Sequence, residues 1–373
     1  MTSIEPTDFI VDKTNLRNGK FVPSALDPAA LKPGQALLKV DKFALTANNV
    51  TYAVAGDSFS YWGFFPGPDG WGRVPVWGYG DVIASAHDDV PVGKRVYGYF
   101  PMSTHLLVEP DKVTKGGFTD VSAHRRDIHG GAYNNYQYTE ADPTHSPANE
   151  PQIMLFRGLF ITGFALDDFL ADNSFWGAQD VVIISASSKT GYATAQVMKQ
   201  NKREGVRIIG LTSPGNVEFV TGLGCYDQVV AYDDIASLEK RPAMTVDMAG
   251  NPHTQAALRT HYGDDLKYYC QVGGTHWEAA GGDLTGGGQD DLPGAAPEVF
   301  FAPGVIGKRI QEWGAAGFQA RVNDSWRQFL PAAKDWVRIV PCNGPDAVQK
   351  IYAEMLDGKV RPDQGPILSL WAD

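Results

Sequence analysis

The architecture of this chain follows from residues 180–191, Asp-Val-Val-Ile-Ile-Ser-Ala-Ser-Ser-Lys-Thr-Gly. Residues 181–185 form a short apolar run, which is typical of a buried parallel strand. Small polar residues follow, then a helical pattern over 192–198, and the alternation continues with a strand at 206–211, a helix at 216–223 and a strand at 229–231. A strand, a small-residue turn and a helix place phosphate at the helix N-terminus, because free N–H groups and the helix dipole favour an anion there. The stretch therefore predicts the nucleotide-binding core of a doubly wound α/β sheet.

The turn after this first strand departs from the glycine pattern G-x-G-x-x-G of dinucleotide-binding turns. Only Gly191 remains, and Ala186, Ser187, Ser188 and Lys189 stand where glycines are usual. Ser and Ala are small enough for a phosphate to approach, serine hydroxyls can donate to it, and the lysine adds a cation. The alternative is an ordinary strand-to-helix turn with a solvated lysine.

Motifs on both sides of the turn occur in one characteristic order. Residues 157–164 (RGLFITGF) precede it, and Leu211-Thr212-Ser213-Pro214 and residues 223–232 (LGCYDQVVAY) follow it. This order resembles the cofactor domain of the medium-chain dehydrogenase/reductase superfamily, in particular its zinc-free, quinone-oxidoreductase-like branch. The resemblance implies a Rossmann-type parallel sheet plus a β-rich GroES-like catalytic domain. It also implies that Thr162 is the family's helix-entering threonine, and that Gly273 lies at the sheet edge where nicotinamide and ribose are held.

Composition limits the classes of protein to consider. The chain has 373 residues, of which 43% are hydrophobic and 20% charged, as expected for a globular protein of two domains. No apolar run reaches the roughly 20 residues of a membrane span, and the first residues do not form a signal peptide. Three widely spaced cysteines are too few for a disulfide framework, and the net charge of −11 argues against nucleic acid. We expect a cytoplasmic protein with no membrane or nucleic-acid partner.

Two domains are predicted from the order of the patterns. Short strands and turns dominate residues 1–110, including a partly alternating strand at 36–45, and residues 111–152 have little apolar periodicity. A β-rich catalytic domain is expected at 1–152, completed by 337–373, with the NADP-binding domain at 153–336. The Pro-rich stretch 142–147 is interpreted as the linker, and residues 281–291 as a flexible loop.

A catalytic metal is not expected. Zinc-dependent members of the resembled family carry a cysteine after the first strand, whereas this chain has Leu45-Thr46-Ala47-Asn48-Asn49-Val50-Thr51-Tyr52. A catalytic zinc needs about three converging protein ligands, and His124 with His129, five apart, is a weak pair.

Without a metal, a tyrosine is the best candidate for a proton donor. Tyr52 follows a loop that resembles the nicotinamide-facing segment of the family, and we predict Tyr52, Tyr61 and Asn49 as catalytic residues, with Tyr79 in reserve. Each tyrosine has a structural alternative, since most of the 15 tyrosines are expected in the core or at its rim. The aromatic insert at 57–73 is interpreted as a wall over a hydrophobic substrate, a satellite core or a dimer contact.

The loop after the second strand favours NADP(H) over NAD(H). NAD specificity usually rests on an acid at this point, which bonds the ribose 2′-hydroxyl. The chain has Thr212 and Ser213 there and Asn216 shortly after, although the family often has a lysine at the last position. The residues predicted to hold the cofactor are Thr162, Ser187, Ser188, Lys189, Thr190, Gly191, Thr212, Ser213, Asn216 and Gly273.

The resemblance implies hydride transfer to a conjugated carbon–carbon double bond, as in enones, quinones or enoyl thioesters. Two other classes stay open: a carbonyl reductase or alcohol dehydrogenase on the same scaffold, and a non-catalytic cofactor-binding protein. The expected partners are a small hydrophobic substrate and a second copy of the chain in a homodimer.

Overall fold

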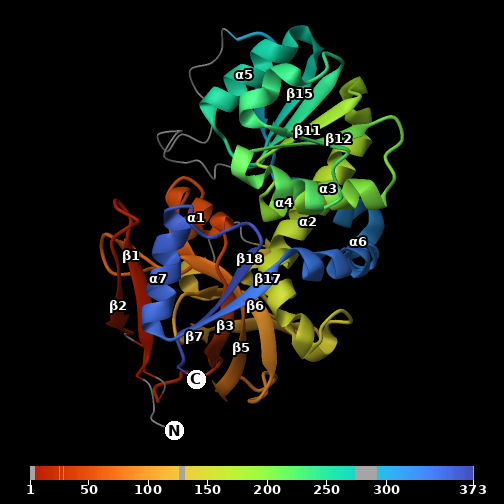
Figure 1. Cartoon of the computed structure of the whole chain (residues 1–373). Coiled ribbons are helices and arrows are strands. Elements are labelled where there is room, and N and C mark those ends of the chain that lie inside the picture. Colours follow the sequence, from red (N-terminus) through yellow and green to blue (C-terminus); the bar gives the residue numbers. More distant parts are fainter. Residues whose placement is uncertain (1–4, 25, 28, 126–130, 274–291, 373) are drawn as a thin grey trace. The chain divides into compact units, whose positions relative to one another are not determined.

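The parallel strands and the β-rich strands of this chain lie in separate units of a computed structural model, which describes residues 5–24, 26–27, 29–125, 131–273 and 292–372 (Figure 1). Unit 1 comprises residues 1–155 and 338–373, and unit 2 comprises residues 156–337. The limits expected from the sequence were 152/153 and 336/337. The predicted fold class, a Rossmann-type α/β sheet together with a β-rich unit, is confirmed.

Unit 2 is built on a six-stranded sheet with the order β13-β12-β11-β14-β15-β16, all of whose pairs are parallel (Figure 1). The chain order reverses between β11 and β14, so the loops that leave these two strands flank a topological switch point, where such sheets bind ligands. The strands are β11 (Asp180–Ile184), β12 (Arg207–Thr212), β13 (Gln228–Ala231), β14 (Ala243–Asp247), β15 (Leu266–Gln271) and β16 (Pro297–Val299). The helices are α2 (Glu150–Asp172), α3 (Lys189–Gln200), α4 (Val217–Gly222), α5 (Pro252–Tyr262) and α6 (Ala302–Trp336).

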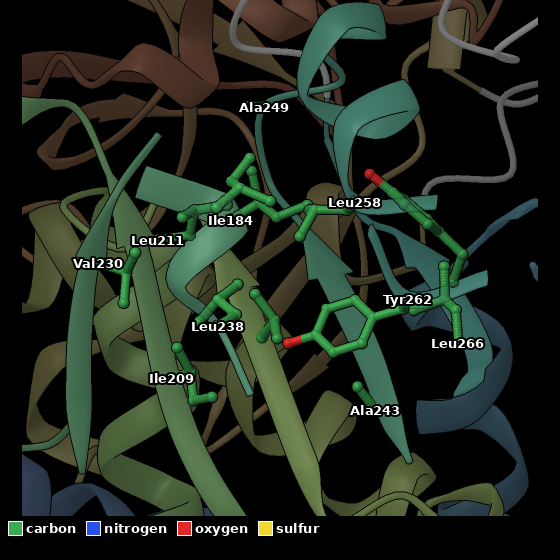
Figure 2. Packing of buried hydrophobic residues seen from close by; sticks show 13 residues of the cluster. Ile184, Ile209, Leu211, Val230, Leu238, Ala243, Ala249, Leu258, Tyr262 and Leu266 are labelled. Carbon is green, nitrogen blue, oxygen red and sulfur yellow. The ribbon is translucent and has the colours of Figure 1, made fainter. Parts of the chain in front are cut away.

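One face of this sheet carries a buried apolar cluster. Figure 2 shows Ile184 of β11, Ile209 and Leu211 of β12 and Leu258 of α5 lying together, all less than 1% exposed. Burying such a side chain stabilises the fold by about 1.5–3 kcal/mol. The apolar run that predicted β11 is therefore the centre of this core.

Unit 1 is β-rich. Its larger sheet contains β3, β5, β6, β7, β8, β9, β10, β17 and β18, and its smaller sheet has the order β2-β1-β4. The strands are β1 (Thr7–Asp12), β2 (Gly19–Pro23), β3 (Ala36–Ala44), β4 (Trp71–Gly72), β5 (Pro75–Ser85), β6 (Arg95–Pro101), β7 (His105–Val108), β8 (Pro110–Thr114), β9 (Gly117–Asp120), β10 (Asn135–Tyr138), β17 (Arg338–Asn343) and β18 (Gln364–Ser369). The helices are α1 (Ala47–Val54) and α7 (Pro345–Leu356).

Residues 111–152 have little apolar periodicity, yet β8, β9 and β10 lie there as short strands whose pattern is too brief to show a period. Residues 298–303 have a pattern that predicts one strand, but β16 ends at Val299 and α6 begins at Ala302. The Pro-rich stretch 142–147 is not the boundary, because the division falls inside α2, between residues 155 and 156. The predicted loop 281–291 and His129 lie outside the described residues.

Candidate cofactor and proton-donor sites

The turn between β11 and α3 has the geometry of a phosphate-binding turn in which serines replace glycines. Ser185 has a positive φ of 60°, a conformation that favours glycine. Ser188 is the N-cap of α3, and its hydroxyl accepts a hydrogen bond from the Gly191 N–H at 3.1 Å. A Cβ at Gly191 would lie 2.9 Å from both the Ser185 carbonyl oxygen and the Ser188 hydroxyl, so only glycine fits. Lys189 and Thr190 begin α3, where N–H groups lack partners within the helix.

A cluster of hydroxyl and amide groups joins this turn to the end of β12. Thr212 Oγ1 donates to Ser187 Oγ at 3.3 Å, and Asn216 Nδ2 donates to Ser187 Oγ at 3.3 Å and to Ser213 Oγ at 3.0 Å. A hydroxyl oxygen has two lone pairs and one hydrogen. The Ser187 oxygen already accepts two hydrogen bonds. Its own hydrogen therefore points away from Thr212 and Asn216, and the hydroxyl can donate to a ligand. The structure thus brings together four of the predicted cofactor residues.

The two remaining predicted cofactor residues do not join this cluster through any hydrogen bond that we observe. Thr162 lies within α2 and donates to the carbonyl of Gly158 at 3.1 Å. Gly273 follows β15, and its N–H donates to the carbonyl of Asp247 at 3.2 Å. A Cβ on this glycine would lie 2.9 Å from the Met248 carbonyl oxygen, so the backbones at the ends of β14 and β15 approach closely.

Two tyrosines that support the turn were not predicted as site residues. The Tyr232 hydroxyl accepts a hydrogen bond from the Ser185 N–H at 3.1 Å, and the Tyr226 hydroxyl donates to the Ala186 carbonyl at 2.9 Å. Burial is the main cause that raises the pKa of Tyr232 to about 12, and the negative charge of Asp247 is the second. Both tyrosines belong to the motif at 223–232, but nothing in the sequence indicates that their hydroxyls bind the backbone of the turn.

In unit 1, Asn49 supports the backbone at the start of α1. Its Oδ1 accepts from the Thr46 N–H at 2.7 Å and the Thr46 hydroxyl at 3.1 Å, and its Nδ2 donates to the Pro75 carbonyl at 2.8 Å. The side chain is 3% exposed. These bonds give Asn49 a structural task that stabilises the helix start, and its catalytic role stays a prediction.

Tyr52 lies in an aromatic cluster that also contains Tyr61 and Tyr133. The ring of Tyr52 lies 4.5 Å from that of Tyr61 and 6.3 Å from that of Tyr133, and the last two rings are 6.1 Å apart. Phe64, Trp77 and Tyr99 surround the three. The ring centroid of Tyr99 lies 5.7 Å from that of Tyr52, and those of Phe64 and Trp77 lie 5.4 and 5.8 Å from that of Tyr133. Tyr52 is 7% exposed, whereas Tyr61 and Tyr133 are partly exposed.

Burial raises the pKa of Tyr52 well above its usual value, Tyr133 raises it further, and Trp77 and Asn48 lower it. Tyr52 is therefore protonated at neutral pH and can act as a donor. Neither Trp77 nor Tyr133 was predicted as a catalytic or cofactor-binding residue, because β5 and the segment after residue 130 are remote from Tyr52 in sequence.

The aromatic insert at 57–73 forms part of the core of unit 1. Trp62, Phe64 and Phe65 are at most 4% exposed, while Phe59 is 51% exposed. Of the three interpretations offered, a satellite core describes these buried side chains. Tyr79, the reserve candidate, is fully buried and lies under the Arg95 guanidinium, 5.1 Å from its ring centroid.

Within the described ranges, no three His, Cys, Asp or Glu side chains gather closely enough to hold a metal ion. In the same part of the chain, no helix has the length and apolar character needed to cross a bilayer.

Solved structures with a similar fold extend over the whole chain. CurA from Vibrio vulnificus in complex with NADPH is 14% identical, with 98% of this chain and 100% of that chain covered and a TM-score of 0.65. The quinone oxidoreductase from Coxiella burnetii is 15% identical, with 98% and 99% covered and a TM-score of 0.54. The yhdH oxidoreductase from Salmonella enterica in complex with NADP is 13% identical, with 97% and 99% covered and a TM-score of 0.51. At these identities the likeness shows a shared fold.

No curated protein matches the chain in sequence. A family model described as "Protein of unknown function (DUF2855)" matches residues 43–361, which is most of the chain. Because this model matches most of the chain, the chain belongs to the DUF2855 family.

Proposed function

We propose that this chain is an NADPH-dependent oxidoreductase that reduces a conjugated carbon–carbon double bond without a metal ion. The observation that carries the proposal is the hydroxyl–amide cluster at the ends of β11 and β12. Ser187, Thr212, Ser213 and Asn216 offer neutral donors where NAD-specific enzymes place an acid. Neutral donors suit a 2′-phosphate better than a carboxylate would, because a carboxylate repels it.

The residues of unit 2 fit a dinucleotide. The Ser187 hydroxyl, whose hydrogen is not used within the cluster, would donate to the 2′-phosphate, and the first N–H groups of α3 would bind the pyrophosphate. Gly191 leaves room for close approach, since a Cβ there would meet the Ser185 carbonyl at 2.9 Å. When bound, NADPH would supply the hydride that adds to the β-carbon of the substrate.

Unit 1 would supply the proton. We propose Tyr52 as the general acid that protonates the α-carbon, because a tyrosine hydroxyl carries its proton at neutral pH and Tyr52 lies in the aromatic cluster with Tyr61 and Tyr133. Proteins of similar fold include an enoyl reductase and a quinone oxidoreductase, which supports this class of reaction. Metal independence rests on residues 45–52, directly after β3, which include no cysteine. It predicts that activity survives a chelator.

The first test is binding of NADPH and NADH, followed by thermal unfolding and fluorescence. A ligand that binds only the folded state at about 100 times its Kd stabilises it by roughly 2.7 kcal/mol. We expect a rise in Tm with NADPH that exceeds the rise with NADH. No rise with either nucleotide would overturn the proposal.

Product analysis separates the alternatives that share this scaffold. A ketone and its conjugated enone analogue are offered with NADPH, and we expect saturation of the C=C bond with the carbonyl retained. An alcohol product would favour a carbonyl reductase. Binding without oxidation of NADPH by any enone, quinone, enoyl thioester or ketone would favour a non-catalytic cofactor-binding protein.

A further inference from the structure

A buried carboxylate lies at the end of β14, at the same level as the turn that follows β11. Asp247 is the last residue of β14, is fully buried, and is aligned in the parallel register with Ile184, the last residue of β11. The N–H of Met248 donates to the Ile184 carbonyl at 3.3 Å, so the two strands stay joined up to the point where their loops leave the sheet. Since adjacent strands lie about 4.8 Å apart, Asp247 lies directly beside the topological switch point.

Four uncharged groups donate hydrogen bonds to this carboxylate. The N–H groups of Ala249 and Gly250 donate to Oδ1 at 2.8 and 3.0 Å. The amide of Gln255, on α5, and the hydroxyl of Tyr269, on β15, donate to Oδ2 at 3.2 and 2.8 Å. Hydrogen bonds to a carboxylate favour its ionised form. Because all four donors are neutral, they fix the position of the negative charge of Asp247 without neutralising it.

A dinucleotide would span the switch point, with its two halves on opposite sides. In doubly wound sheets, each half of the sheet takes one mononucleotide. The cluster of Ser187, Thr212 and Asn216 lies on the side of β11 and β12, where the proposed function places the 2′-phosphate of the adenosine half. The nicotinamide half would then lie on the side of β14 and β15, to which Asp247 belongs.

The oxidised and reduced forms of the cofactor differ in charge only at the nicotinamide ring. When bound NADPH gives up its hydride, both electrons of the broken C–H bond go to the β-carbon of the substrate, and the ring changes from neutral to a cation. We propose that the buried charge of Asp247 stabilises this cation and so favours NADP⁺ over NADPH in the site, an inference that rests on the proposed function. Because positive charge develops on the ring as the hydride leaves, the same carboxylate assists the transfer.

The test compares the Kd values of three ligands by fluorescence titration: NADP⁺, NADPH and adenosine 2′,5′-bisphosphate, which lacks the nicotinamide half. Asp247→Asn removes the charge, while its amide oxygen can still accept from the two N–H groups, and the Gln255 amide can turn over to accept from the new NH₂. The ratio of the Kd for NADP⁺ to that for NADPH should rise about fivefold, because a buried charge acts through an effective dielectric constant of about 20 rather than that of water. The Kd for the bisphosphate should stay within about twofold of the wild-type value, since it binds on the other side of the switch point.

Two further variants complete the experiment. Gln255→Lys neutralises the carboxylate without changing Asp247, because its ammonium would replace the amide that donates to Oδ2 at 3.2 Å. It should raise the same ratio, and it tests the proposal if Asp247→Asn does not fold. Tyr269→Phe is the matched control, since it removes one hydrogen bond from the carboxylate but keeps the charge. We expect its ratio to equal that of the wild type. Thermal unfolding of each variant shows that it is folded.

The outcomes distinguish this inference from the proposed function. If the wild type binds both forms of the cofactor, and the folded Asp247→Asn and Gln255→Lys variants keep its ratio, the inference is wrong and the proposed function stands. The inference is also overturned if all three ligands weaken by one factor, or if Tyr269→Phe changes the ratio as much as Asp247→Asn, because either result indicates a purely structural network. If the wild type binds neither NADPH nor NADP⁺, both proposals fall.

Discussion

Ser187 illustrates at the residue scale how neighbours determine the use of a single hydroxyl. Its oxygen accepts hydrogen bonds from Thr212 and Asn216, so its own hydrogen is directed to a third group. In our proposal that third group is the ligand.

The amide of Asn216 should contribute to cofactor selectivity. In Asn216→Asp, a carboxylate would repel the 2′-phosphate and could accept a hydrogen bond from the 2′-hydroxyl of NADH. We expect the Kd for NADPH to rise about tenfold, which corresponds to about 1.4 kcal/mol, and the Kd for NADH to fall. Titration with both nucleotides measures this. Asn216→Gln, which keeps the amide, is the control, and an unchanged NADPH affinity in the Asp variant would contradict the assignment.

Gly191 is the one glycine of the turn whose close contacts exclude a side chain. Gly191→Ala places a Cβ 2.9 Å from a backbone oxygen, and we expect a loss of about 1–3 kcal/mol in the free energy of unfolding together with weaker NADPH binding. Urea unfolding and nucleotide titration check the two effects. Gly215→Ala, whose Cβ would meet nothing within 4 Å, should change neither.

The local part of the cofactor site could be predicted from sequence, and the long-range part could not. Ser187, Thr212, Ser213 and Asn216 follow consecutive parallel strands, whose ends must meet at one edge of the sheet. Trp77 and Tyr133 join the aromatic cluster around Tyr52 from β5 and from a short helical turn at 131–134, and no periodicity indicates which aromatic residues will meet.

At the scale of elements, α6 is two helical segments joined at one residue. Gly314 has φ 73° and ψ 156° inside the range assigned to α6, a region of backbone space that is essentially restricted to glycine. The residue pattern from 305 to 336 is typical of one long helix and does not predict this break. The reason is that a lone glycine in a helical pattern is usually tolerated as part of a continuous helix.

Two glycines three residues apart in α6 should therefore respond in opposite ways to alanine. Gly314→Ala should cost about 1–3 kcal/mol through backbone strain alone, since a Cβ there meets nothing within 4 Å. Gly317→Ala should stabilise by about 0.5–1 kcal/mol, because it lies in a helical segment and its Cβ would have only an ordinary 3.5 Å contact. Urea unfolding of both variants measures the pair. Equal effects would contradict the break at Gly314.

At the scale of the whole molecule, a buried carboxylate in unit 1 should make stability depend on pH. Burial acts to raise the pKa of Glu150, but hydrogen bonds from Arg95, Lys42 and His145 outweigh it and lower the pKa to about 2. Arg95 is bidentate on this carboxylate, at 2.8 and 2.9 Å, and also binds Asp41 and Asp81.

Since the folded pKa of Glu150 lies below its ordinary value of 4.5, its contribution to stability is present above about pH 4.5 and is lost as pH falls toward about 2. Glu150→Gln should lower the free energy of unfolding at neutral pH and flatten its dependence on pH in this window. Urea unfolding at several pH values checks both. Glu354→Gln removes an exposed pair with Lys350 and should leave the wild-type slope, because such pairs contribute little.

The fold as a whole was more predictable than its details. The alternation of strand and helix from β11 to β15 is periodic and apolar, so the doubly wound parallel sheet followed from general rules. The short strands β9 and β10 contain buried aromatic residues such as Phe118 and Tyr136 beside polar ones, and their pairing depends on partners that only tertiary structure supplies.

Unit 2 interrupts unit 1 in the chain, and this has a consequence for biosynthesis. On the ribosome, unit 2 is complete before β17 and β18 have been made, yet β18 pairs with β3 through Ala44 and Phe43. Domains generally fold as units during synthesis, so here the later unit should reach its native state first. Until β18 has been made, Phe43 and Ala44 of β3 lack their partner strand, although β7 already pairs with residues 36–39 on the same edge. A nascent chain stalled before β17 would expose this end of β3 to chaperones.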